Sequence, residues 1–144
     1  MKRSSGILLP ISALPAPYGI GTLGRAAFEF VDFLAAAGQS WWQVLPVGPT
    51  SYGDSPYQSL STFAGNPYFI DLDMLVEDGL LRADEVRAVD WGADETQVDY
   101  GILYEHRFAL LAKAAEKGLK RDAAAVAAFA SEKRGWLEDY ALFM

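Results

Sequence analysis

Two short apolar runs in the first third of the chain predict buried strands. The first covers residues 6–9 and is ended by Pro10, and the second covers residues 41–47 and is stopped by Gly48 and Pro49. Both runs are nearly continuous in apolar character instead of alternating with polar residues, which is typical of strands covered on both faces. The pattern therefore predicts an α/β fold in which helices cover a parallel sheet.

Helical spacing of apolar residues accounts for the stretch between the two runs and for most of the second half. Such spacing predicts that one face of each helix packs on a core, while glycine and capping residues mark the helix ends. Three helices are expected: from Thr22, as the N-cap, to Ala37 before Gly38; from about Tyr100 to Gly118, with Tyr104, Phe108, Leu111 and Ala115 on the packed face; and from Ala123 to Lys133, with Asp122 as the cap.

A loop rich in turn-forming residues follows the second run. Glycine adopts backbone angles that other residues resist and proline fixes φ, so the loop has a defined shape. Tyrosine adds a flat apolar face with a polar tip, which suits stacking on a pyranose ring and hydrogen bonding at its rim. The residues concerned are Tyr52, Tyr57 and Tyr68, with Gly53, Gly65, Pro56 and Pro67 between them. Because binding loops in α/β folds lie at the carboxyl ends of strands, this loop is the candidate sugar-binding surface.

Six segments, in order along the chain, carry a resemblance to one enzyme family. They are 6–10 (GILLP), 18–24 (YGIGTLG), 42–46 (WQVLP), 52–59 (YGDSPYQS), 64–68 (AGNPY) and 136–144 (WLEDYALFM). These segments resemble the amino-terminal part of the amylomaltases, which are 4-α-glucanotransferases, or disproportionating enzymes, related to the α-amylase superfamily. The resemblance covers the whole chain but only the front of the family's barrel.

A fold and a domain arrangement are implied by this resemblance. The expected fold is α/β: the amino-terminal part of a TIM-type (β/α)8 barrel with the start of an inserted helical subdomain. Residues 1–75 would supply the first βα units and the substrate loop, and residues 76–144 would form the mainly helical inserted subdomain.

The resemblance also implies an activity for the whole enzyme. Such an enzyme transfers α-1,4-glucan segments between maltooligosaccharides by a retaining mechanism and needs no cofactor and no metal. Retention requires a nucleophilic carboxylate and an acid/base carboxylate about 5 Å apart. In the family these groups come from barrel strands later than Met144, so no catalytic residue is expected here. The chain is expected to bind a maltooligosaccharide or other α-1,4-glucan without containing the catalytic machinery.

Site residues are implied in the same way. Tyr57 resembles the tyrosine that stacks on the sugar beside the cleaved bond, and Ser55 and Asp54 would lie near that sugar. Tyr57 could instead plug the barrel mouth, and Asp54 could instead order its own loop through an Asx-type hydrogen bond. Tyr52 and Tyr104 resemble a pair that forms a second, non-catalytic glucan site in some members, or they are two half-buried tyrosines beside a helix.

Composition and charge argue against several other kinds of partner. The net charge of −7 and a pI near 4.6 argue against nucleic acid, whose binders present basic patches. The chain has no cysteine and a single histidine, His106, so a metal site is not expected. The absence of cysteine also fits a reducing compartment, and a cytoplasmic location is expected. No apolar run approaches the ~20 residues that cross a bilayer, and the run after residues 1–5 is too short for a signal peptide, so no membrane association is expected.

Two other classes of protein compete with this interpretation. A non-catalytic carbohydrate-binding fragment or module would use the same tyrosine loop. A nucleotide-binding domain would explain the G-x-G-x-x-G spacing of residues 19–24. Those glycines, however, follow a proline-rich loop and not the strand's own turn, and no acid lies between Asp32 and Asp54 to hold a ribose hydroxyl. They are better explained as a tight turn before a helix.

The chain by itself is expected to be marginally stable. A closed barrel has no free edge, whereas a chain with only its first two main strands leaves residues 7–9 and 44–45 without the elements that would cover them. The isolated chain is therefore expected to self-associate through these strands, to exchange elements between copies, or to be ordered only in the presence of the rest of the enzyme.

Overall fold

The computed structural model describes residues 3–94 and 96–144. The elements are β1 (Gly6–Leu8), α1 (Arg25–Ala36), β2 (Trp41–Gln43), α2 (Leu72–Glu77), α3 (Ala83–Arg87), α4 (Tyr100–Ile102), α5 (Phe108–Arg121), α6 (Ala123–Glu132) and α7 (Arg134–Phe143). Short 3-10 turns cover Ile11–Ala13 and Pro67–Phe69, and a π-helical turn, Leu103–Arg107, joins α4 to α5. In the part of the chain that the structure covers, no helix is long and apolar enough to span a bilayer.

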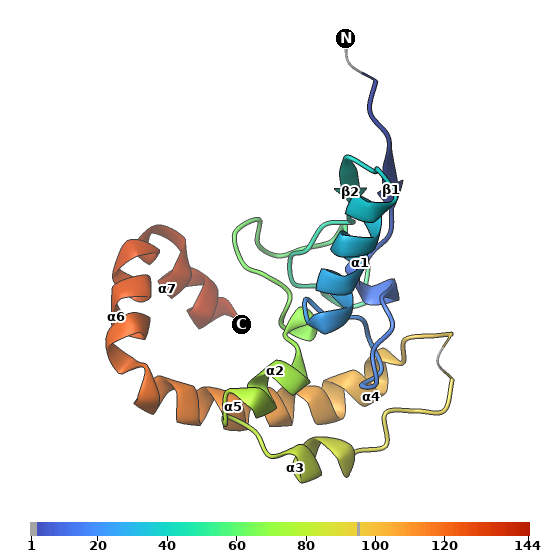
Figure 1. Cartoon of the computed structure of the whole chain (residues 1–144). Coiled ribbons are helices and arrows are strands. Elements are labelled where there is room, and N and C mark those ends of the chain that lie inside the picture. Colours follow the sequence, from blue (N-terminus) through green and yellow to red (C-terminus); the bar gives the residue numbers. More distant parts are fainter. Residues whose placement is uncertain (1–2, 95) are drawn as a thin grey trace.

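The two strands form a parallel pair, as the sequence predicts. β1 and β2 pair in parallel with Ile7 opposite Trp42, and α1 connects them and lies beside the pair (Figure 1). The ring of Trp42 meets Phe30 of α1 edge-on, with 5.1 Å between ring centroids. Its Nε1 donates a hydrogen bond to the carbonyl oxygen of Leu9 at 2.8 Å. The two strands and α1 thus form one βαβ unit with a small core of its own.

The strand pair is shorter and more open than the apolar runs predict. β2 ends at Gln43, so most of the 41–47 run lies in the following loop. Leu8 of β1 is 56% exposed and Trp41 of β2 is 67% exposed. The interpretation that both faces are covered is wrong for this chain, because α1 packs against the pair at Trp42 while all three residues of β1 are exposed.

Two predicted helix ends are wrong, each for its own reason. α1 begins at Arg25 with Gly24 as its N-cap, while the Thr22 hydroxyl donates to the carboxylate of Asp71 at 2.5 Å. α5 continues through Gly118 to Arg121, since glycine inside a helix only weakens it. A helix does begin after Asp122, as expected, although the Asp122 carboxylate accepts a hydrogen bond from Arg121 and does not cap it.

The main core lies where α2, α3 and α5 meet the loop after β1. Its buried residues are Tyr18, Leu72, Leu81, Val86, Leu110 and Ala114, and a neighbouring cluster contains Ile20, Tyr68 and Leu103. The packed face of the Tyr100–Arg121 region is one residue out of register with the prediction, because Leu103, Arg107, Leu110 and Ala114 are buried where Tyr104, Phe108, Leu111 and Ala115 were expected. Tyr104 is consequently left on the outside.

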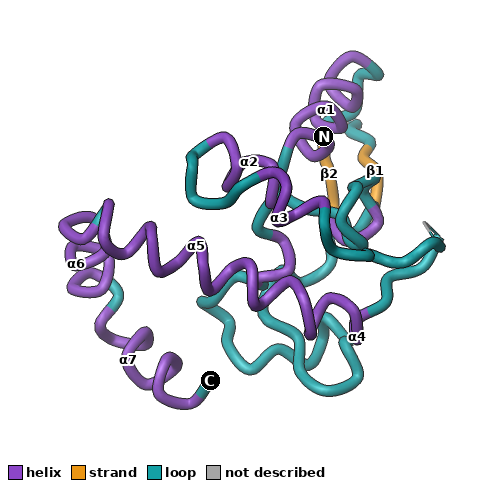
Figure 2. Tube along the Cα trace, turned by 90° about the horizontal axis from the view of Figure 1, so that it is seen from below, coloured by secondary structure: helices purple, strands orange, loops and turns teal. Residues whose placement is uncertain are grey.

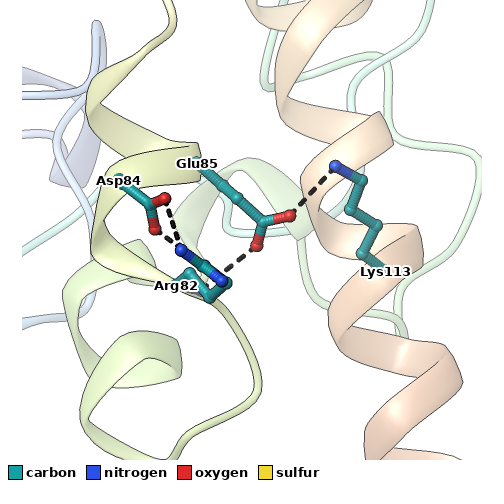
Figure 3. A network of polar contacts seen from close by, with 4 residues as sticks. All are labelled: Arg82, Asp84, Glu85 and Lys113. Carbon is teal, nitrogen blue, oxygen red and sulfur yellow. Dashed lines mark hydrogen bonds and ion pairs between the residues drawn. The ribbon is translucent and has the colours of Figure 1, made fainter.

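A polar network fixes α3 against α5. The Glu85 carboxylate accepts from the backbone N–H of Arg82 at 3.3 Å, at the start of α3, and pairs with Lys113 of α5 at 3.4 Å (Figure 3). The Arg82 guanidinium binds Asp84 through two hydrogen bonds of 2.9 and 2.7 Å, which lowers the pKa of the Asp84 carboxyl. These groups are largely exposed, so the network fixes the orientation of the helices more than it adds stability.

Arg107 is the buried charge that joins three segments. Its side chain is fully buried, and its Nη1 and Nη2 donate to the carbonyl oxygens of Tyr18 at 3.2 Å and Ile70 at 2.6 Å. Its Nε has no hydrogen-bond partner among the described residues. Burial lowers the pKa of Arg107 to about 10, and the nearby Asp71 carboxylate opposes that shift. One guanidinium therefore holds the loop after β1 and the turn before α2 against the π-helical turn.

Replacing Arg107 with Met should lower the free energy of unfolding of the whole protein by roughly 2–4 kcal/mol, because two carbonyl groups in the interior lose their donor. Urea denaturation would measure the change. Arg121→Met is the matched control, since Arg121 also donates to a carbonyl oxygen, that of Asp78 at 2.8 Å, but is 49% exposed. The control should change stability much less. Equal effects would show that the buried contacts of Arg107 are unimportant.

The last three helices form an arm that turns back on the body of the molecule. α5 runs along the base, α6 rises from its end, and α7 returns toward the loop between β2 and α2 (Figures 1 and 2). The end of the arm, α7, and that loop therefore face each other.

Candidate functional site

The candidate site is the long loop between β2 and the Pro67–Phe69 turn. Its base is closed by a hydrogen bond from the backbone N–H of Asn66 to the carbonyl oxygen of Val47 at 2.8 Å. The Asn66 side chain caps the following turn by accepting from the N–H of Tyr68 at 3.0 Å. At Gly48 the two legs touch, since a Cβ there would clash with the Ser59 hydroxyl. The loop is thus a closed structure with a fixed stem.

Two consecutive β-turns form the tip of the loop. In the first, the N–H of Asp54 donates to the carbonyl oxygen of Ser51 at 3.0 Å, and Gly53 has the positive φ of 92° that its position requires. In the second, the N–H of Gln58 donates to the carbonyl oxygen of Ser55 at 3.1 Å. The Ser51 hydroxyl then donates to the carbonyl oxygen of Gln58 at 3.3 Å, which joins the two turns.

Tyr57 is the third residue of the second turn. Pro56 precedes it and fixes φ, as proline does at the second position of a turn. The N–H of Tyr57 donates to the Ser55 hydroxyl at 3.4 Å, and its side chain is 72% exposed. The structure therefore presents an aromatic ring on a pre-shaped turn, with Ser55 directly beneath its backbone.

Asp54 lies next to Tyr57 and has an unusual backbone conformation. Its φ of 56° is in the left-handed region, which aspartate tolerates better than most residues. The Asx-type hydrogen bond is not seen, since among the described residues no hydrogen bond reaches the Asp54 carboxylate. Burial, and then the Asp54 charge, raise the pKa of Tyr68 and Tyr100. The Asp54 charge therefore acts on both tyrosine hydroxyls.

Tyr52 and Tyr104 are both open to solvent, so the description of them as half-buried is wrong. Tyr52 is fully exposed at the first turn, and Tyr104 on the π-helical turn is 70% exposed. Tyr104 meets Phe108 edge-on at 5.9 Å between ring centroids. No ring pair joins Tyr52 to Tyr104 in the described part of the chain. Each ring could contact a ligand from its own element.

Tyr68 does not offer a face to a ligand, contrary to the expectation for the three tyrosines of the loop. It is only 7% exposed. Its ring packs against Tyr100 at 5.8 Å and Phe108 at 5.2 Å between centroids. The Pro67–Phe69 turn folds this residue back onto the start of α5, and burial raises the pKa of its hydroxyl. Tyr68 is therefore the anchor of the loop.

The acidic residues near the core have structural partners. Asp71 caps α2 by accepting from the N–H of Met74 at 2.9 Å and also accepts from Thr22. Asp73 accepts from the Tyr18 hydroxyl at 2.6 Å, and burial followed by this bond raises the pKa of Tyr18 to about 12. Within the described ranges, no group of three or more metal-ligating side chains gathers. His106, the single histidine, is exposed.

Comparisons with known proteins point to one family. A family model described as 4-alpha-glucanotransferase matches residues 9–144. The 4-alpha-glucanotransferases of Streptococcus pneumoniae serotype 4 and Thermus thermophilus are each 51% identical to this chain, over 99% and 100% of its length. The structure of an amylomaltase from Streptococcus agalactiae in complex with acarbose covers 99% of this chain with a TM-score of 0.94 and 45% identity.

The same comparisons show that the chain spans a minor part of its relatives. It covers 28% of the Streptococcus pneumoniae protein, 29% of the Thermus thermophilus protein and 29% of the Streptococcus agalactiae amylomaltase chain. A 4-alpha-glucanotransferase of Solanum tuberosum, described as chloroplastic/amyloplastic, is 38% identical, and the chain covers 26% of it. The relatives therefore contain much that this chain does not.

Proposed function

Because this chain belongs to the 4-alpha-glucanotransferase family, we propose that it is the amino-terminal, substrate-binding part of a 4-α-glucanotransferase. The whole enzyme would transfer α-1,4-glucan segments between maltooligosaccharides with retention of configuration, without a cofactor and in the cytoplasm. One observation carries the proposal: Tyr57 is held exposed on a pre-shaped turn, in a chain whose fold matches an acarbose-bound amylomaltase with a TM-score of 0.94.

The fold of the whole protein is part of the proposal. Residues 1–75 would form the first βα units of a TIM-type barrel together with the substrate loop, and residues 76–144 the start of an inserted helical subdomain. The parallel β1–α1–β2 unit supports the first assignment, because such units repeat around a barrel. The loop that follows β2 would then lie at the carboxyl end of the barrel, where TIM-barrel enzymes place their active sites.

In this proposal the chain binds the substrate and the rest of the enzyme reacts with it. Tyr57 would stack on the glucose unit beside the bond to be cleaved, which fixes the ring without taking part in proton transfer. Ser55 and Asp54 would meet the hydroxyl groups at the ring's edge. The nucleophile and the acid/base would come from later strands, and the donor glycosyl would pass to the 4-hydroxyl of another glucan instead of to water.

A non-catalytic carbohydrate-binding fragment or module is the second candidate. It is favoured by the distribution of acids, because Asp71 and Asp73 serve the core and Asp54 is the one acid in residues 48–68. Both candidates bind a glucan at Tyr57, but only the first makes new glycosidic bonds in the full-length protein.

Replacing Tyr57 with Ala in the full-length enzyme should lower kcat/KM for maltotriose, because a stacking surface beside the reacting ring is lost. The fall should correspond to a loss of ~1–3 kcal/mol of transition-state stabilisation. Steady-state kinetics of glucose release measure this. Tyr57→Phe is the control that keeps the ring and should retain most of the activity. Unchanged kinetics for Tyr57→Ala would identify Tyr57 as a packing residue.

The same series separates the second glucan site from the first. Tyr52→Ala and Tyr104→Ala should leave maltotriose kinetics near those of the wild type and should alter the size distribution of products from long amylose, because a remote surface touches only long chains. A loss of activity on maltotriose equal to that of Tyr57→Ala would place these residues at the reacting bond.

A further inference from the structure

The substrate loop meets α7, the last helix of the arm, through one pair of aromatic rings in the described structure. Phe63, on the returning leg of the loop, stacks on Trp136 of α7 with 5.7 Å between ring centroids and an interplanar angle of 25°. Around this pair an open groove of about 510 Å³ separates residues 59–63 from α7. The C-terminal end of the arm and this loop face each other in Figure 1.

Two adjacent groups of hydrogen bonds order the loop between Phe63 and the Tyr57 turn. The Ser61 hydroxyl oxygen accepts from the N–H groups of Phe63 at 3.2 Å and Ala64 at 3.1 Å, and the Ser59 hydroxyl donates to the carbonyl oxygen of Ser61 at 2.7 Å. The Ser51 hydroxyl donates to Gln58 on the other side. Serine side chains thus order residues 51–58 and residues 59–64 as two hydrogen-bonded groups, which the Gln58–Ser59 peptide bond joins.

The Phe63–Trp136 pair connects the loop to α7, and its facing ring surfaces are not free to bind a ligand. One face of each ring is occupied by the other ring, and Trp136 also meets Tyr140 at 6.1 Å between centroids. Trp136 is only partly exposed, whereas Phe63 at 70% is almost as exposed as Tyr57 at 72%. A sugar would have to separate Phe63 from Trp136 to stack between them.

We propose that Trp136 is a positioning residue for Tyr57: α7 braces the returning leg of the loop through Phe63, and so sets where the Tyr57 ring stands relative to the glucan. The proposal rests on the proposed function for its consequence in catalysis. Its structural part, that α7 orders the loop, stands on the ring stack and the serine hydrogen bonds alone.

The structural part is tested by hydrogen exchange of the full-length protein without substrate. Trp136→Ala should speed exchange of the hydrogen-bonded amides of Asp54 and Gln58 by at least about three-fold, because a restraint on the loop is removed. Phe129→Ala, an exposed aromatic of α6 at 48% exposure, is the matched control and should leave those amides unchanged. Unchanged exchange in Trp136→Ala would overturn the proposal, whatever the activity of the enzyme.

The catalytic part is tested by the split between KM and kcat. Trp136→Ala should raise KM for maltotriose about five-fold with kcat within about two-fold of wild type, and Trp136→Phe should restore KM. Phe63→Leu removes the same ring stack from the loop instead of from α7, and it should raise KM in the same way. A lower kcat with unchanged KM and a lower Tm would indicate a merely structural role and overturn the proposal.

A double mutant decides whether Trp136 acts through Tyr57. In the Tyr57→Ala background, adding Trp136→Ala should raise KM no further, because the ring that it positions is already absent. Independent, multiplied effects would overturn the proposal. Failure of the proposed function would look different: the wild-type full-length protein would then form no longer oligosaccharides, while the exchange result would still test the Phe63–Trp136 contact.

Discussion

The isolated 144-residue chain should form neither glucose nor longer oligosaccharides from maltotriose. A retaining transfer needs two carboxylates about 5 Å apart across the scissile bond. The acids nearest the core serve other purposes, since Asp71 caps α2 and binds Thr22 while Asp73 binds Tyr18. Asp54 stands at the tip, but no second described carboxylate accompanies it there.

Chromatographic product analysis of a pure, mass-verified sample tests this expectation. The full-length enzyme at the same molar concentration is the positive control, and it should consume the maltotriose. Turnover by the isolated chain would show that a catalytic pair lies within these residues, and the assignment of the machinery to later strands would have to be withdrawn.

The isolated chain should also fail to unfold as a cooperative monomer. Leu8, Trp41, Phe28 and Phe33 of the βαβ unit are 56, 67, 63 and 63% exposed. Burial of apolar surface stabilises a fold by roughly 25 cal/mol per Å². While this surface stays exposed, that stabilisation is missing and does not offset the conformational entropy that the chain loses on folding. We therefore expect self-association or a broad, weak transition.

Size-exclusion chromatography with light scattering and a thermal melt would measure this. Changing Leu8 and Trp41 together to Ser should shift the chain toward monomer if these strands carry the association, whereas changing the exposed Phe129 of α6 to Ser should not. A wild-type monomer with one sharp transition would show that the segment folds independently, and would favour the carbohydrate-binding module.

Local pattern was enough to predict the β1–α1–β2 unit and its parallel pairing. Apolar runs and helical spacing are set by neighbours in the sequence, and the confirmed prediction used only those. The start of α1 was misplaced because Thr22 binds Asp71, a residue far along the chain, instead of capping the helix beside it. A hydrogen bond to a residue so far along the chain cannot be recognised from the residues around Thr22.

The packed face of α5 shows a second limit. Apolar residues occupy two adjacent stripes there, and the choice between them depends on Arg107, whose guanidinium reaches the carbonyl oxygens of Tyr18 and Ile70. A buried arginine contradicts simple hydropathy, so the pattern favoured the neighbouring stripe with Tyr104. Burial of Arg107 in turn places Tyr104 outside, where it is free for a ligand.

The turns of the loop that carries the candidate site follow from the sequence, but the contacts that hold its side chains do not. Glycine and proline marked the turns, and the exposure of Tyr57 and Tyr52 agrees with their predicted availability. Tyr68 was misjudged because its burial depends on rings from Tyr100 and Phe108. The contact between Phe63 and Trp136 could not be foreseen either, since nothing local indicates that α7 returns to the loop.

Incubation of the full-length protein with maltotriose, followed by separation of all products, is the decisive experiment. We expect glucose together with maltooligosaccharides longer than the substrate, and a large fall in both when Tyr57 is replaced by Ala. Release of glucose without longer products would mean hydrolysis instead of transfer. Absence of any product, or full transfer by Tyr57→Ala, would contradict the claim that this chain forms the substrate-binding part of a glucanotransferase.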